Sequence, residues 1–311
     1  MPLLCFGYGF SARAARRLLR PTGIAVAATY RRSGDEIGLL QEEVEPIALA
    51  RLESPEFNLN SYPYLLISAP PLPTTGEDAA VLARHSDPIL AVLELRERDR
   101  TLSLHPESRI FYLSTTGVYG DHRQAWVDET TLAAPTTERG MRRLAAEQGW
   151  SEFAHRHSLQ LSILRLAGIY GLGRSVLDTI RAGKAQRIHK EGQVFSRIHV
   201  EDIGLVIATL MARPFAAGVR VFNLCDDRPC PPAEVVEYGC QLLGVAPPPL
   251  REFAEVAASL SPMAASFYSE SKRVSNHRLK AEILPQLQFP DYRLGLDAIF
   301  AAEQPVPSSR D

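Results

Sequence analysis

Three small residues near the N-terminus have the spacing of a phosphate-binding turn. Gly7 and Gly9 are followed by Ala12, and they lie between an apolar run at Leu3–Phe6 and the helix-forming composition of Ser11–Leu19. In such a strand–turn–helix, the first glycine permits the tight turn and the second lets the backbone approach a pyrophosphate. The small third residue keeps helix and strand close. Because the helix N-terminus also offers free N–H groups, the spacing predicts a dinucleotide-binding turn.

Two arginines, Arg31 and Arg32, directly follow the next apolar run, Ile24–Tyr30. At this point a protein that binds NAD places Asp or Glu, which accepts hydrogen bonds from the ribose hydroxyls. That carboxylate is missing, and the first acid of the chain is Asp35. Because a guanidinium matches a phosphate in shape and charge, the pair favours NADP over NAD. The alternative is that Arg31 stacks on the adenine ring and selects neither cofactor.

A hydroxyl cluster, Ser114-Thr115-Thr116, ends an apolar run that begins at Arg109. Further motifs follow in order, at residues 164–174, 197–202 and 222–224. Together with the glycine turn, they resemble the extended short-chain dehydrogenase/reductase family, which includes nucleotide-sugar epimerases and dehydratases. The resemblance spans nearly the whole chain.

The resemblance implies a catalytic hydroxyl, a tyrosine general acid/base and a lysine four residues after the tyrosine. Thr115 matches the hydroxyl, which orients the substrate. Aligning the family's usual glutamate with Glu147 puts Arg139 at the tyrosine position and Arg143 at the lysine position. A guanidinium, with a pKa above about 12, does not exchange a proton near neutral pH, so Arg139 cannot replace the tyrosine. Arg143 could still hydrogen-bond the ribose, and the chain resembles an atypical subgroup without the complete triad.

The resemblance also implies further contacts to the cofactor. The predicted cofactor-binding residues are Gly7, Gly9, Phe10, Ser11, Ala12, Arg31, Arg32, Ala69, Pro70, Ser114, Arg143 and Leu166.

Other tyrosines could carry the proton in place of the missing one. Tyr119 and Tyr170 are expected near the nicotinamide, the alternative being that both pack under the substrate region. Tyr268 and Lys272 also have the Tyr-x-x-x-Lys spacing, but they lie far from the cofactor strands in sequence.

No metal site is predicted. His199 and Asp202, at i and i+3, share a helix face, and the resemblance implies that they brace the junction between domains. The cysteines show neither a C-x-x-C spacing nor a paired histidine pattern; they are Cys5, Cys225, Cys230 and Cys240.

These residues need a scaffold in which strands and helices alternate. Strands are predicted at Leu3–Phe6, Ile24–Tyr30, Pro46–Ala50, Tyr64–Ser68, Arg109–Ser114, Leu161–Leu166 and Arg220–Leu224. Helices are predicted at Ser11–Leu19, Gly76–Arg100, Thr137–His157, Val200–Ala212 and Ala233–Leu243. This alternation predicts an α/β fold with a Rossmann-type, doubly wound parallel sheet of about seven strands.

The expected domains follow from the same pattern. Residues 1–165, with about 197–225, form the NAD(P)-binding domain. Residues 166–196 and 226–302 form a smaller substrate region, and residues 303–311 form a tail.

Composition narrows the classes of protein. The 311 residues are 45% hydrophobic and 23% charged, with a net charge of −2, so no attraction to nucleic acid or to a membrane surface is expected. Only four of the 34 basic residues are lysines, and the first 183 residues contain none, which excludes lysine-dependent chemistry there. The N-terminus lacks the regions of a signal peptide, so a cytoplasmic protein is expected.

Two functions stay open at this point. The chain could be an NAD(P)-dependent oxidoreductase or nucleotide-sugar-modifying enzyme, with a small-molecule substrate. It could instead be a non-catalytic sensor of NADP(H). The helices at 76–100 and 137–157 match the pair that builds a homodimer interface in the resembled family, although the charges at 94–99 count against it.

Overall fold

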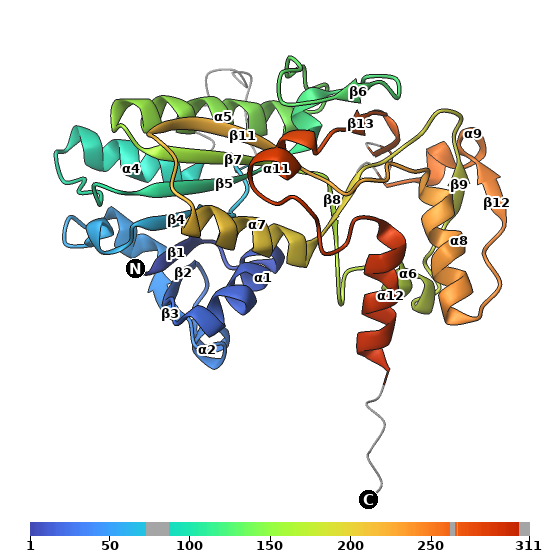
Figure 1. Cartoon of the computed structure of the whole chain (residues 1–311), viewed down its shortest axis with the longest axis horizontal. Coiled ribbons are helices and arrows are strands. Elements are labelled where there is room, and N and C mark those ends of the chain that lie inside the picture. The colour runs from blue at the N-terminus through green and yellow to red at the C-terminus, as the bar shows by residue number, and fades with distance from the viewer. Residues whose placement is uncertain (73–86, 262–264, 266, 305–311) are drawn as a thin grey trace, which may run out of the picture. The chain divides into compact units, whose positions relative to one another are not determined.

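The computed structural model describes residues 1–72, 87–261, 265 and 267–304 (Figure 1). The chain divides into two compact units. The first unit contains Met1–Gly120, Leu132–Leu166 and Ile203–Asn223, and the second contains Asp121–Thr131, Ala167–Asp202 and Leu224–Asp311.

A seven-stranded sheet forms the centre of the first unit. Across the sheet the strands are β3 (Glu45–Ala48), β2 (Val26–Tyr30), β1 (Leu3–Phe6), β4 (Tyr64–Ile67), β5 (Arg109–Thr115), β7 (Gln160–Leu166) and β11 (Gly218–Leu224). The first six pair in parallel. The seventh does so too, because Gly218 N–H donates to Leu159 where both strands begin and Ala167 N–H donates to Leu224 where both end. The predicted fold class is confirmed.

Helices cover both faces of this sheet (Figure 1). On one face lie α4 (Pro88–Arg98) and α5 (Glu138–Arg156), whose Leu90 and Trp150 share a core with the buried side chains of the strands. On the other face lie α1 (Phe10–Leu19), α2 (Asp35–Gln41) and α7 (Val200–Ala212).

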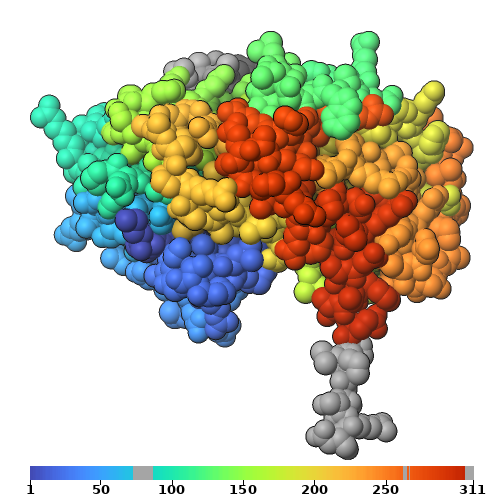
Figure 2. Space-filling model, in the orientation of Figure 1, coloured from blue at the N-terminus to red at the C-terminus, as the bar shows by residue number. Residues whose placement is uncertain are grey.

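The crossing of α1 and α7 is unusually close. A Cβ atom on Gly204 would lie 2.9 Å from the carbonyl carbon of Ala14, so the two helix backbones approach without a side chain between them. In the space-filling view the yellow segment that contains α7 lies directly on the blue N-terminal segment (Figure 2). The helix that follows the glycine turn is therefore held in place by a helix from much later in the chain.

The predicted helix at Gly76–Arg100 is shorter in its described part. Residues 76–86 lie outside the described residues, and the helix runs from Pro88 to Arg98. Asp87 caps it, because its carboxylate accepts hydrogen bonds from the N–H groups of Ile89 and Leu90. Short 3-10 helices complete the described connections: η1 (Arg20–Thr22), η2 (Leu49–Glu53), η3 (Leu59–Ser61), η4 (Thr116–Tyr119) and η5 (Ala257–Ser259).

The second unit is built from two-stranded pairs and short helices. The pairs are β8 (Gly168–Tyr170) with β10 (Arg197–His199), β9 (Arg187–His189) with β12 (Leu250–Glu252), and β6 (Trp126–Val127) with β13 (Arg273–Val274). The helices are α6 (Val176–Arg181), α8 (Pro232–Leu243), α9 (Phe253–Val256), α11 (His277–Glu282) and α12 (Tyr292–Glu303). Tyr170, Leu177 and Tyr292 belong to its core.

The bounds of the units and of α12 differ from the expected domain boundaries in several places. Asp121–Thr131, expected in the first domain, belongs to the second unit because β6 pairs with β13 there. Residues 197–202 belong to the second unit as well, since β10 pairs with β8. Glu303, expected in the tail, ends α12 and forms an ion pair with Arg181, while residues 305–311 lie outside the described residues.

Among the described residues, the structure contains no helix with the length and apolar character needed to cross a bilayer.

Candidate functional site

The first glycine of the predicted turn is held in a conformation that favours glycine. Gly7 has φ +88°. Its N–H donates to the Thr29 hydroxyl at 3.0 Å, and its carbonyl accepts from the Ser68 hydroxyl at 2.6 Å. A Cβ atom there would lie 3.1 Å from the backbone nitrogen of Ala69. The turn is thus fixed by the strands on either side of β1.

The second glycine leaves the space before α1 open. Gly9 is the N-cap of α1, and among the described residues no atom outside its chain neighbours and its own helix lies within 4 Å of the place that its Cβ would occupy. No described side chain caps this helix, and its first turn contains no acidic residue. Ser11 and Ala12 are buried against the sheet, and Phe10 is half-buried. Backbone N–H groups and an open approach are what a pyrophosphate requires.

Arginines near this turn fall into two groups. Three of them pair with the two glutamates after α2: Arg13 with Glu42 at 3.1 Å, Arg16 with Glu43 at 3.3 Å, and Arg20 with Glu43 at 3.1 Å. Arg31 and Arg32 are exposed directly after β2, which is the neighbour of β1 in the sheet. Neither guanidinium has a hydrogen-bond or ion-pair partner within the part of the chain that the structure describes. Their positive charges are therefore available to an anion.

The remaining predicted contacts lie at the carboxyl ends of neighbouring strands. Ala69 and Pro70 follow β4, where Ala69 N–H donates to Phe6 of β1. Leu166 ends β7 and is the register partner of Thr115, which ends β5. Because β1, β4, β5 and β7 are consecutive in the sheet, these residues share one edge with the glycine turn.

The two hydroxyls at the end of β5 have different surroundings. Thr115 is half-buried, and its Oγ1 accepts from the N–H of Gly117 at 3.1 Å. Ser114 is buried, and its hydroxyl donates to the Glu147 carboxylate of α5 at 2.5 Å. The side chain of Ser114 is therefore directed into the interior, and Thr115 is the hydroxyl left near the edge of the sheet.

The two arginines predicted at the positions of the catalytic tyrosine and lysine both lie on α5, and their environments differ. Arg139 is exposed. Arg143 is buried beneath β5, and its Nη1 donates to the carbonyl of Leu113 at 2.8 Å and to the hydroxyl of Tyr112 at 3.3 Å. The guanidinium thus holds the end of β5. A contact between Arg143 and a cofactor ribose stays a prediction.

For the two tyrosines, the structure favours the packing alternative. Tyr119 is 0% exposed, and its hydroxyl donates to Asn223 at 2.7 Å. Tyr170 is buried in the second unit, with its ring 5.1 Å from that of His199, and burial raises the pKa of its hydroxyl. Both side chains are therefore buried, and a role for either in proton transfer stays a prediction.

The other candidate groups also have structural partners in the second unit. Lys272 forms an ion pair with Glu270 at 2.7 Å, and the ring of Tyr268 packs 5.1 Å from that of Phe253. The Asp202 carboxylate accepts from the N–H groups of the segment 288–289, at 2.7 and 3.1 Å. Within the described residues no three His, Cys, Asp or Glu side chains come together as a metal site would require.

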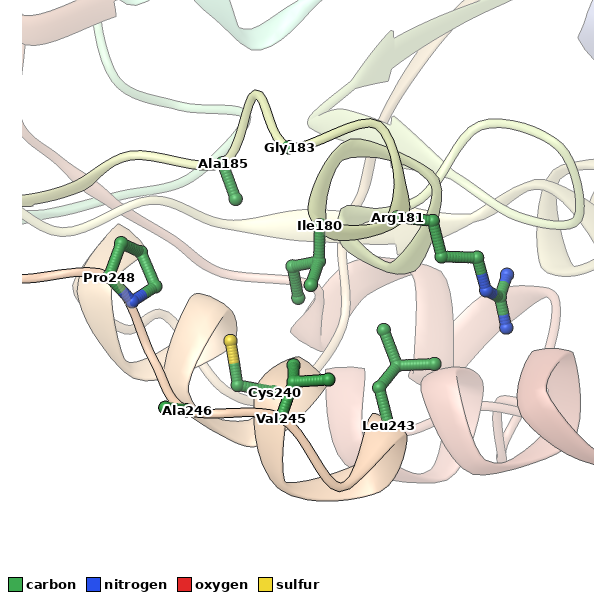
Figure 3. Close-up of a pocket in the computed structure, with 9 residues that line it drawn as sticks. All are labelled: Ile180, Arg181, Gly183, Ala185, Cys240, Leu243, Val245, Ala246 and Pro248. Carbon is green, nitrogen blue, oxygen red and sulfur yellow. The ribbon is translucent and has the colours of Figure 1, made fainter.

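A hollow in the second unit does not contain any of the predicted site residues (Figure 3). It has a volume of about 520 Å³ and lies between the ends of α6 and α8, with Ile180, Cys240 and Leu243 among its lining side chains. Arg181 is the charged residue of its lining, and its guanidinium is already paired with Glu303 at 2.6 Å. The hollow therefore offers an apolar surface without a free charge.

Comparison with known proteins decides the family. The family model for the NAD dependent epimerase/dehydratase family matches residues 86–225. A functionally unknown conserved protein from Silicibacter pomeroyi DSS is 43% identical, with 97% of this chain and 98% of that chain covered and a TM-score of 0.79. The chain belongs to the NAD dependent epimerase/dehydratase family. The resemblance stated from the sequence motifs is confirmed.

More distant relatives of this epimerase/dehydratase family member share its fold. MoeE5 in complex with UDP-glucose and NAD is 21% identical, with a TM-score of 0.69 and 97% and 98% of the two chains covered. UDP-glucuronic acid 4-epimerase from Bacillus cereus in complex with NAD is 15% identical, with a TM-score of 0.70 and 97% and 96% covered. No curated protein is significantly similar to the chain.

One buried carboxyl outside the sheet edge should make stability depend on pH. Asp226 of the second unit is 1% exposed, and burial raises its pKa to about 7. In the unfolded chain it titrates near its ordinary value of about 3.9, so between pH 4 and 7 the folded protein binds more protons. Stability should therefore fall as pH rises through that window, by about 1.4 kcal/mol per unit of pKa difference, and level off above it.

Asp226→Asn removes the titrating group and should flatten this dependence. The measurement is urea unfolding followed by circular dichroism at pH 5 and pH 8. Asp227→Asn, at the exposed neighbouring position, is the control and should keep the wild-type slope. An unchanged slope in Asp226→Asn would show that the carboxyl is ionised throughout the range.

Proposed function

We propose that the first unit of this chain binds NADP(H) at the carboxyl edge of its sheet. The observation that carries the proposal is the pair Arg31 and Arg32, exposed beside the glycine turn and without a described partner, where an NAD-selective site would hold a carboxylate. Gly7 and Gly9 supply the turn and the open approach for the pyrophosphate. The structural relatives that contain NAD support a dinucleotide at this edge.

We further propose that the protein is an oxidoreductase or nucleotide-sugar-modifying enzyme. The second unit supplies the substrate region, and the relative with bound UDP-glucose supports a nucleotide sugar as the class of substrate. When bound, the nicotinamide ring would supply a hydride acceptor or donor. Thr115 would orient the substrate, since its hydroxyl hydrogen is not used by the bond that its oxygen accepts from Gly117.

A second candidate function is a sensor of NADP(H) without turnover. It is favoured by α5, on which the sequence motifs predict Arg139 and Arg143 at the positions of the catalytic pair. Arg143 is committed to the β5 backbone, and a guanidinium does not transfer protons near neutral pH. A cytoplasmic location and a homodimer remain predictions from the sequence.

Thermal unfolding with added cofactor tests the binding proposal. A ligand that binds only the folded chain at about 100 times its Kd stabilises it by about 2.7 kcal/mol, which raises Tm measurably. We expect a larger shift with NADPH than with NADH at equal concentration. A larger shift with NADH would refute the role of the two arginines, and no shift with either would refute cofactor binding.

Turnover separates the two candidate functions. With a panel of nucleotide sugars and aldehydes, we expect NADPH consumption or sugar conversion that falls about 100-fold or more in Thr115→Val, because one orienting hydrogen bond to the reacting group is lost. The NADPH-dependent shift in Tm should persist in that variant.

Thr209→Val, whose hydroxyl donates to the Leu205 carbonyl within α7, is the control and should keep most of the activity. If Thr115→Val is as active as the wild type, Thr115 has no role in the reaction. If the wild type converts no member of the panel but still binds NADPH, the sensor is the better description.

A further inference from the structure

A row of polar side chains lies just below the carboxyl edge of the sheet. Ser114, Arg165 and Asn223 are the second-to-last residues of β5, β7 and β11, and Ser114 is the register partner of Arg165. All three are buried. Two residues earlier on each strand, the same face is part of the hydrophobic core under α5, through Tyr112, Ile163 and Val221. The change from an apolar to a polar row of side chains therefore occurs at one layer, next to the carboxyl edge of the sheet.

Glu147 of α5 is the centre of this row. It is 3% exposed, and its carboxylate accepts the Ser114 hydroxyl at 2.5 Å. Arg165 donates to both of its oxygens, with Nη2 2.7 Å from Oε2 and Nε 3.1 Å from Oε1. This bidentate geometry fixes the orientation of both side chains. Glu147 thereby links the helix to two adjacent strand ends.

The other end of the network lies on the turn that follows β5. The guanidinium carbon of Arg165 lies 4.8 Å from the centre of the Tyr119 ring, and the Tyr119 hydroxyl bonds to Asn223. Tyr119 is the last residue of η4, and Ser114 precedes Thr115, the N-cap of the same element. The network therefore holds the turn that carries Thr115 at both of its ends.

The stability of the fold does not by itself explain why the ion pair of Glu147 and Arg165 is buried at this place. A buried ion pair generally stabilises a fold no better than apolar residues of the same volume, whereas its directional bonds restrict the geometry. We propose that Glu147 and Arg165 are positioning residues: they set the Thr115–Tyr119 turn in the geometry that receives the nicotinamide half of the cofactor. The inference rests on the proposed function and concerns only that half, because the adenosine half is assigned to Arg31 and the glycine turn.

The binding of two ligands distinguishes a positioning role of Glu147 from a general loss of structure in the variant. NADPH spans both halves of the site, whereas 2′,5′-ADP contains only the adenosine half. In Glu147→Gln we expect the Kd for NADPH to rise about tenfold or more, since small displacements of positioning groups have large effects, while the Kd for 2′,5′-ADP stays within about twofold. Tyr119→Phe, which keeps the ring over Arg165 and removes only the hydroxyl, should show the same pattern more weakly.

Phe153→Leu is the matched control, because it alters the core on the same helix outside the network. It should lower Tm and leave both Kd values unchanged. The inference is overturned if the folded Glu147→Gln and Tyr119→Phe variants bind NADPH as the wild type does, or if both ligands weaken equally.

A measurement without ligand tests the positioning role of Glu147 independently of the proposed cofactor binding. Hydrogen exchange at the Gly117 amide, which bonds to Thr115 Oγ1, reports the order of the turn. We expect exchange about tenfold faster in Glu147→Gln and in Tyr119→Phe, and no change in Phe153→Leu. If wild-type protein fails to bind 2′,5′-ADP, the proposed function fails, whereas unchanged exchange at Gly117 overturns the positioning role.

Discussion

Replacing Arg31 and Arg32 together with serine should weaken NADPH binding about 100-fold while NADH binding changes by no more than about threefold. Each guanidinium that bonds to a phosphate contributes about 1.5–3 kcal/mol, and 1.4 kcal/mol corresponds to a factor of ten in Kd. NADH lacks the 2′-phosphate, so the lost charges have no partner on it. The measurement is a titration followed by the fluorescence of the reduced nicotinamide.

Arg20→Ser is the control for this double variant. It removes a positive charge from the same acid-free segment, but that charge is paired with Glu43 in the structure. Its Kd for NADPH should remain close to the wild-type value. Equal weakening of NADPH and NADH in the double variant would indicate the alternative role, in which Arg31 stacks on adenine and selects neither cofactor.

The largest effect on stability is expected from Arg165→Met. The variant leaves the carboxylate of Glu147 buried without its ion-pair partner, and breaking a buried pair in this way costs about 3–5 kcal/mol. That is a large part of the 5–15 kcal/mol that typically separates folded from unfolded protein. Urea unfolding followed by the fluorescence of Trp150, buried in the first unit, measures the change.

Removing both partners should reverse most of that loss. In the double variant Arg165→Met with Glu147→Leu, no charge stays buried, and apolar side chains of similar volume replace the pair. We expect the double variant to be within about 1 kcal/mol of the wild type. A double variant that is less stable than Arg165→Met would show that the pair itself contributes the stability. By the inference above, the double variant should nevertheless bind NADPH more weakly.

Elements of the first unit's sheet and its helices could be predicted because their signals are local. Leu3–Phe6 is the predicted strand and Val200–Ala212 the predicted helix, each with its observed bounds. The turn at Gly7 follows from residue types within a few positions of one another, and its positive φ explains why glycine is there. Periodicity and turn chemistry act over short distances, so a single sequence contains them.

The polar row could not be predicted from the sequence because its members meet only through the register of the sheet. The sequence predicts that Ser114 contacts the cofactor, and it does not show that the Ser114 hydroxyl bonds to Glu147, 33 residues later. It also does not show that Tyr119 bonds to Asn223, 104 residues later. The signal that could have found them is the alternation of β5, β7 and β11, since each places a polar residue where its buried face should continue.

The second unit was harder to predict for a different reason. Its strands are only two or three residues long, as in β6 and β13, which is too short for an alternating pattern to appear. The pairing of these two strands joins segments almost 150 residues apart. For this reason Asp121–Thr131 belongs to the second unit and not to the first domain, where the sequence pattern placed it. Short elements of this kind are specified by tertiary contacts rather than by local composition.

Helix α5 contains the two predicted reactive positions and the buried glutamate at different points along its length. Arg139 and Arg143 are predicted to occupy the positions of the family's reactive pair, and Glu147, one turn further, joins the strand ends. Substitution at 139 leaves the Glu147 bonds intact, so reactivity can be lost while the shape of the ligand site is retained. Ligand binding and reactivity would then be separable by substitutions on a single helix.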